Sequence, residues 1–84
     1  MILVVKNIEH KVHETELKHL FNYYGEVIET NIVYDTTTWK SKGFAIIEMK
    51  NTGEAIEAME KLNGVRLHGQ PLVVKKDQVF VNKS

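Results

Sequence analysis

The most informative stretch of the sequence is Lys42-Gly43-Phe44-Ala45-Ile46-Ile47-Glu48-Met49. Its residues 43–49 are rich in apolar and β-branched side chains and predict a β-strand. Because successive side chains of a strand point to opposite faces, Phe44 and Ile46 share one face, while Ala45 and Ile47 share the other. The sequence therefore predicts a strand that carries an aromatic ring on the face opposite Ala45 and Ile47.

The segments on either side of this strand alternate between strand and helix patterns. In chain order they are a strand at 2–8, a helix at 14–24, a strand at 27–35, a helix at 54–62 and a strand at 72–75. Gly25 stands where the first helix needs a C-terminal cap, and Asn63-Gly64 supplies a turn after the second. Pro71 is expected to begin the last strand at a sheet edge, since proline has no N–H for the ladder.

This order of elements predicts an α+β fold, the ferredoxin-like βαββαβ sandwich, in which a four-stranded antiparallel sheet packs both helices on one face. Strand alternation assigns one apolar set to the helix side: Leu3, Val5, Ile47, Met49, Leu72 and Val74. It leaves a second set on the open face: Val4, Lys6, Asn31, Val33, Phe44, Ile46, Val73 and Lys75. This open face is unusually apolar, and we expect the function to lie there.

Length and composition favour one small intracellular domain. The 84 residues suffice for a single hydrophobic core, assigned to residues 1–77, with residues 78–84 as a C-terminal tail. The absence of cysteine favours a cytoplasmic location, and the apolar run at 2–5 is too short for a signal sequence or a membrane span. Eleven basic and eleven acidic residues balance, which argues against tight, nonspecific binding to phosphates.

Two motifs resemble those of the RNA-recognition-motif family. The octamer 42–49 matches that family's second signature at its first four positions and at the sixth, whereas Ile46 and Met49 replace aromatic residues. The hexamer 3–8 is similar to the first signature, with the expected Asn7 but with Val4 at the usual aromatic position. Other family-like positions extend the resemblance over residues 2–76: Leu17, Leu20, Phe21, Gly25, Val27, Asp35, Leu62, Asn63 and Gly64.

The resemblance implies that the open face binds single-stranded RNA, with single-stranded DNA as an open alternative. Phe44 is the one ring left to stack on a base, a contact worth about 1 to 3 kcal/mol. Val4 and Ile46 would contact a base or a sugar, and Trp39 would stack on a base or make some other contact from its polar loop. The expected RNA-binding residues are Val4, Lys6, Asn31, Val33, Trp39, Lys40, Lys42, Phe44, Ile46, Val73 and Lys75. The lysines among them would meet phosphates.

Two other uses of the open face remain possible at this point. Its apolar residues would also suit a protein partner or a homodimer, because monomers seldom leave contiguous apolar area uncovered. Alternatively, Val79, Phe80 and Val81 of the tail would fold back over the sheet. Truncation after Asp77 should then increase RNA binding.

Neither a metal site nor an enzymatic site is expected. The four histidines lack the spacing of a ligand pair on a helix, and there is no cysteine. No nucleophile motif or phosphate-binding loop is present, and Glu54, Glu57 and Glu60 have the spacing of a solvated helix face. We therefore predict a non-enzymatic module without a cofactor or a metal ion.

Overall fold

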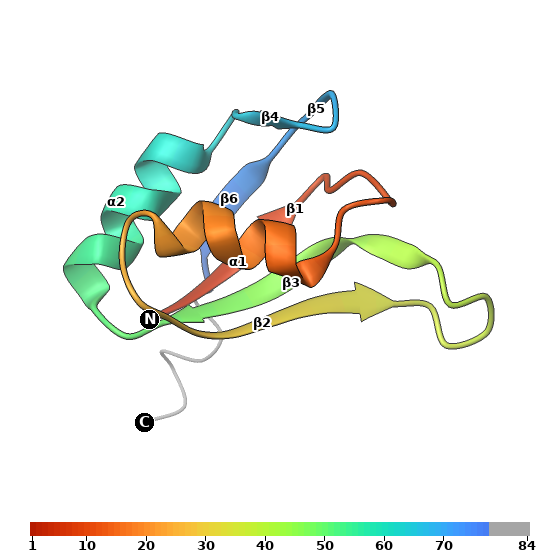
Figure 1. Ribbon diagram of the computed structural model, residues 1–84, viewed down its shortest axis with the longest axis horizontal. Helices are drawn as coiled ribbons and strands as arrows, with labels where there is room; N and C mark the ends of the chain where they lie inside the picture. Colours follow the sequence, from red (N-terminus) through yellow and green to blue (C-terminus); the bar gives the residue numbers. More distant parts are fainter. Residues whose placement is uncertain (78–84) are drawn as a thin grey trace.

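The computed structural model describes residues 1–77 of the 84-residue chain. Val79, Phe80 and Val81 lie outside these described residues, so the expected fold-back of the tail stays a prediction. Within residues 1–77 the elements follow in this order (Figure 1): β1 (Ile2–Lys6), α1 (Glu14–Asn22), β2 (Val27–Tyr34), β3 (Ser41–Met49), α2 (Thr52–Leu62), β4 (Arg66–Leu67), β5 (Gln70–Pro71) and β6 (Val73–Lys76). The expected βαββαβ order is confirmed, with a small extra hairpin, β4–β5, before the last strand.

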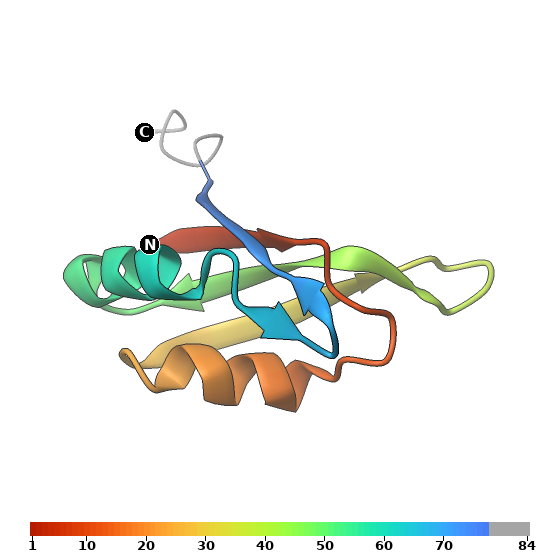
Figure 2. The ribbon, with the colours of Figure 1, turned by 90° about the horizontal axis from the view of Figure 1, so that it is seen from above.

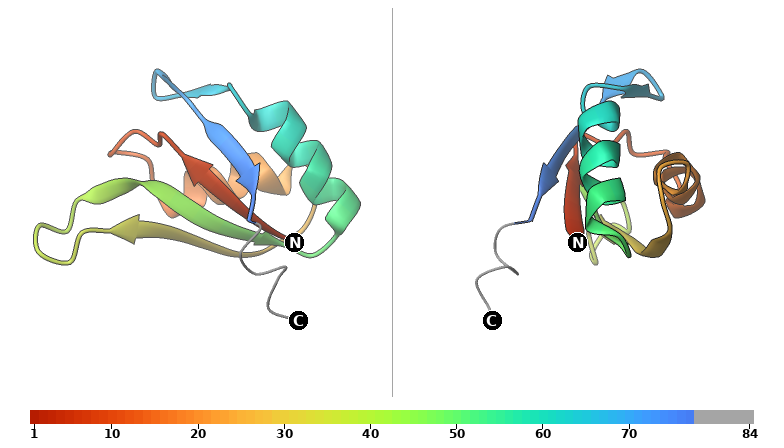
Figure 3. Two further views of the ribbon diagram at one scale, coloured as in Figure 1. Left: turned by 180° about the vertical axis from the view of Figure 1, so that it is seen from behind. Right: turned by 90° about the vertical axis from the view of Figure 1, so that its left-hand side faces the viewer.

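The main sheet is antiparallel, with its strands in the order β2-β3-β1-β6, so β1 and β3 lie at its centre. Figure 3 shows both helices on one side of the sheet and the strands uncovered on the other. The prediction that Pro71 begins the last strand is wrong. Pro71 belongs to β5, which pairs with β4 in a separate two-stranded sheet, and β6 begins at Val73. A proline is tolerated in so short a hairpin because few ladder bonds are needed there.

The hydrophobic core lies between the sheet and the helices (Figure 2). Leu17 and Phe21 of α1 and Ala55, Ala58 and Leu62 of α2 are buried, and their spacings of three and four place them on one face of each helix. The sheet contributes the residues that alternation assigned to the helix side, all of them buried: Leu3, Val5, Ile47, Met49, Leu72 and Val74. That assignment is confirmed.

Gly25 does not act as the helix cap that its position suggested. α1 ends at Asn22 with Tyr23 as its capping residue, and Gly25 does not have a positive φ. Instead, Gly25 lets the loop after α1 approach the first turn of α2 closely. A Cβ on Gly25 would stand 2.6 Å from the Cβ of Glu54, an atom that cannot move without its backbone. Glycine is therefore required here for space.

Gly25→Ala should lower the free energy of unfolding by about 1 to 3 kcal/mol, the usual cost of forcing a methyl group into a packed contact. The measurement is urea unfolding followed by circular dichroism. Gly53→Ala in α2 is the matched control, because a Cβ there meets Asn51 Oδ1 at an ordinary 3.4 Å. Because Gly53 lies in the first turn of α2, the substitution should leave stability unchanged or raise it by at most about 0.5 kcal/mol. A fully stable Gly25→Ala protein would contradict the close approach of the loop to α2.

Candidate nucleic-acid interface

The open face is organised in rows, because residues opposite one another on neighbouring strands lie side by side across a sheet. In the first row, Phe44 of β3 lies opposite Lys6 of β1, which in turn lies opposite Val73 of β6. The second row runs across all four strands and consists of Asn31, Ile46, Val4 and Lys75. The left view of Figure 3 shows these strands from their uncovered side. The structure therefore brings the predicted sheet residues together.

Burial separates these residues into a shallow apolar centre and a polar margin. The half-buried members are Val4, Val33, Phe44, Ile46 and Val73. Lys6, Asn31 and Lys75 are exposed, so their polar groups can reach a ligand that lies on the apolar centre. One aromatic ring, aliphatic neighbours and two lysines together form a surface that can stack one base and contact its neighbours.

Trp39 and Lys40 lie apart from these rows, in the loop between β2 and β3, which projects beyond the rest of the sheet (Figure 1). Asp35 closes this loop, because its N–H donates to the carbonyl of Lys40 at 2.8 Å and its carbonyl accepts the N–H of Trp39 at 2.7 Å. Trp39 is 75% exposed and has a φ of 59°, in the left-handed region that favours glycine. A large ring is thus held in solvent at some cost in backbone energy.

The carboxylate of Asp35 also holds the loop from inside. It accepts the N–H of Thr37 at 2.8 Å and the N–H of Thr38 at 3.1 Å. Both hydrogen bonds lower the pKa of Asp35 below its ordinary value of 3.8, and the bond from Thr37 has the larger effect. The positive charge of Lys42 lowers this pKa further. Lys42 is exposed at the start of β3, so it lies between this loop and the first row.

A third row was missed by the sequence reasoning. Glu48 of β3 lies between Ile2 of β1 and Glu29 of β2 in the strand register. Asp77 continues the row past Ile2, because its N–H donates to the carbonyl of Ile2 at 3.0 Å. By alternation with the second row, the side chains of these residues lie on the open face. Glu29 also accepts the side-chain N–H of Asn31 at 2.6 Å, which ties the second and third rows together.

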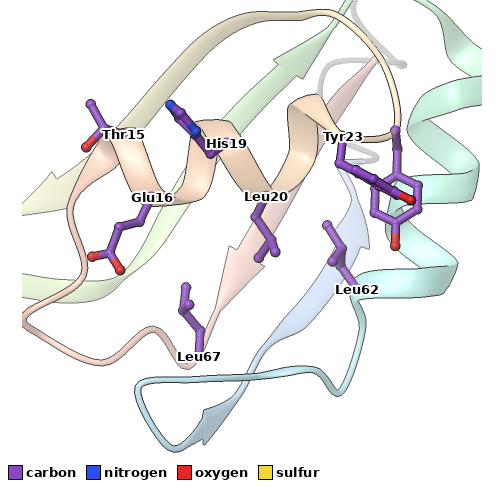
Figure 4. A pocket seen from close by; sticks show the side chains of 8 residues that line it. Thr15, Glu16, His19, Leu20, Tyr23, Leu62 and Leu67 are labelled. Carbon is purple, nitrogen blue, oxygen red and sulfur yellow. The ribbon is translucent and has the colours of Figure 1, made fainter.

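A separate groove of about 620 Å³ lies on the helix side (Figure 4). Its lining consists of Thr15, Glu16, His19, Leu20, Tyr23, Tyr24, Leu62 and Leu67. Near one end Glu16 Oε2 lies 2.8 Å from Nε2 of His68, and this hydrogen bond is the main reason that the pKa of Glu16 falls below its ordinary value of 4.5. None of the predicted site residues lines this groove, so it is distinct from the open face.

Residues 1–77 hold no group of three or more His, Cys, Asp or Glu side chains arranged to bind a metal ion. Neither helix in this part of the chain is long and apolar enough to cross a membrane.

The fold and the open face define a class of protein, the small α+β domains that present an uncovered four-stranded antiparallel sheet to a ligand. Within that class, the sequence identifies the family. Residues 3–73 match the family model of the RNA recognition motif, and the chain belongs to this family. The family resemblance predicted from the two motifs is confirmed.

Relatives and solved structures agree with this membership. The chain is 34% identical over 74 residues to the chloroplastic 29 kDa ribonucleoprotein of Arabidopsis thaliana, a match that covers 88% of this chain and 22% of that protein. The RNA-binding protein PG1, known from a crystal structure, is 32% identical in sequence to this chain. The two structures superpose with a TM-score of 0.89, and the match covers 93% of this chain and 94% of PG1. The Rna15 RRM with bound RNA (GU) is 26% identical, with a TM-score of 0.82 and coverage of 92% and 82%. The chain thus spans about a fifth of the length of the curated relatives it matches.

The hydrogen bonds from Thr37 and Thr38 to Asp35 should weaken in acid, when the carboxylate loses its charge. Because folding lowers the pKa of Asp35, the stabilisation is fully present above the ordinary value of 3.8 and disappears as the pH falls below it, through the lowered pKa. By NMR, the amide shifts of Thr37 and Thr38 should be constant near neutral pH and titrate together in acid. In Asp35→Asn the side chain still accepts but does not ionise, so these amides should not titrate. If the amides of Thr37 and Thr38 still titrated in Asp35→Asn, another ionisable group would be responsible for the change in the loop.

Trp39→Gly should raise the free energy of unfolding by up to about 1 kcal/mol, because glycine adopts a positive φ without the steric penalty of a Cβ. Trp39→Ala removes the same ring but keeps the Cβ, so its stability should stay near that of the wild-type protein. Chemical denaturation of the three proteins gives the comparison. Equal stability of the two variants would mean that the left-handed conformation at residue 39 carries no cost.

Proposed function

We propose that this domain binds short single-stranded RNA on its open face, with Phe44 as the stacking platform. The observation that carries the proposal is the position of Phe44 on a central strand, half-buried on the uncovered face and directly opposite Lys6. A base stacked on this ring brings its own phosphate within reach of a lysine. The names of the relatives, a ribonucleoprotein and an RRM with bound RNA among them, support the same ligand class.

Binding should be weak, because two positions that are aromatic in the family are aliphatic here. Val4 and Ile46 lie side by side in the second row and offer apolar contact without π-stacking. Each lost base–aromatic stack is worth about 1 to 3 kcal/mol, so the pair removes a large part of the usual affinity. Four lysines remain to meet phosphates: Lys6, Lys40, Lys42 and Lys75.

Trp39 and Asn31 would add to this site in different ways. Trp39 is exposed at the end of the projecting loop, where it can stack on a nucleotide that extends past the first row. Asn31 has an amide held by Glu29, so it can read the edge of a base that lies on Ile46. Contacts with the 2′-hydroxyl would favour RNA over single-stranded DNA.

A homodimer through the open face is the less favoured use of this surface. A two-fold interface pairs the same patch of both copies, so it would bury Lys6 and Lys75 twice, and only the carboxylates of the third row could pair with them. Removing such charges from water is costly. RNA phosphates, in contrast, neutralise both lysines. We therefore infer a binding module for nucleic acid and assign it no catalytic role.

Phe44→Ala should weaken RNA binding by a factor of about 5 to 150, the equivalent of one lost base stack. The experiment is an NMR titration of labelled protein with random-sequence single-stranded RNA at low and moderate salt. Wild-type shifts should cluster on β1 and β3 and shrink as salt rises. Tyr23→Ala is the control, because Tyr23 is an aromatic residue on the helix side that is 84% exposed. Its removal should leave RNA binding unchanged.

Two results would contradict the proposal. One is the absence of RNA-dependent shifts on β1 and β3 at millimolar RNA, above all if the tumbling time is that of a dimer. The other is an equal loss of binding in Phe44→Ala and Tyr23→Ala, which would separate RNA binding from the open face.

A further inference from the structure

We propose that the third row of the open face ends the RNA footprint, so that RNA lies over the first and second rows and not over the third. This inference rests on the proposed RNA binding and concerns the length of RNA that the face accepts. It follows from how charge is distributed along the strands.

The charge of the open face changes sign from one end of the sheet to the other. The first row contains Lys6, and Lys40 and Lys42 lie beyond it toward the projecting loop. The second row contains Lys75. The third row contains two carboxylates, on Glu29 and Glu48, and no lysine or arginine. A phosphate chain is therefore attracted at one end and repelled at the other.

The spacing of the rows makes this repulsion effective. Rows on one face are two residues apart along a strand, about 7 Å, which is shorter than the screening length of about 8 Å at physiological salt. The nearest basic residue past Met49 is Lys50, whose ammonium lies 4.0 Å from the carboxylate of Glu26. A phosphate above the third row would thus face carboxylates, with that lysine already beside an acid.

We expect the protein to fold without the negative charges of Glu29 and Glu48. Glu29 and Glu48 lie directly opposite one another, and like charges in that arrangement destabilise a sheet. Replacement by glutamine keeps the size of the side chain and an oxygen that can accept the N–H of Asn31. The double variant Glu29→Gln/Glu48→Gln should therefore fold and keep the second row intact.

The test compares binding of random-sequence RNAs of four and eight nucleotides at low salt. The gain in affinity from the shorter to the longer RNA should be about threefold to tenfold larger in Glu29→Gln/Glu48→Gln than in the wild-type protein, as expected from removing the charge interactions of one exposed and one half-buried carboxylate. Glu57→Gln/Glu60→Gln on α2 is the control, because it makes the same change in net charge on the helix side. This control variant should show the same gain in affinity from four to eight nucleotides as the wild-type protein.

NMR gives a second, independent result. In the wild-type protein the octamer should shift the amides of Phe44 and Lys6 but not those of Glu29 and Glu48, whereas in the double variant all four should shift. Equal shifts of all four in the wild-type protein, or an equal length dependence of both double variants, would overturn the boundary. Loss of all shifts at Phe44 and Lys6 with either RNA would instead overturn the proposed RNA binding itself.

Discussion

The antiparallel pairing of β1 with β3 is the constraint on which the rest of the structure depends. These strands are central, and their register sets Leu3 against Ile47 and Val5 against Ala45 on the helix side. The same register sets Lys6 against Phe44 and Val4 against Ile46 on the open side. A slip of one residue in either strand would exchange its two faces, exposing core residues and burying a lysine. The core and the candidate site are therefore fixed by one set of hydrogen bonds.

The open face shows how a binding surface is retained when its usual aromatic residues are reduced. Val4 and Ile46 keep the centre of the face apolar and half-buried. Phe44 therefore has an apolar neighbour, Ile46, on the same face of its own strand. In the proposed RNA binding, affinity would depend on a single ring and on a few lysines. Within residues 1–77, Trp39 offers a second exposed ring beside this face, held at the loop tip by the hydrogen bonds of Asp35 and by a left-handed backbone.

Strand alternation was enough to predict the core and most of the candidate site, because a period of two is a local property of a strand. Gly25 and Pro71 were misjudged because their roles depend on contacts that the local pattern does not contain. Gly25 meets Glu54 of another helix, and Pro71 lies in a hairpin too short to show a pattern. Glu48 could have been placed on the open face by alternation alone. Its position opposite Glu29 could not, since the register shifts between Val27 and Glu29.

The balanced charge of the chain also takes a different meaning in the folded structure. Eleven basic and eleven acidic residues suggest little attraction to phosphates when they are only counted. In the fold, however, Lys6 and Lys75 lie in the first and second rows, while Glu29 and Glu48 lie together in the third. Over distances near the screening length, a ligand responds to this local order rather than to the total. A domain with no net charge can therefore attract the phosphates of an RNA chain at one end of a sheet and repel them at the other.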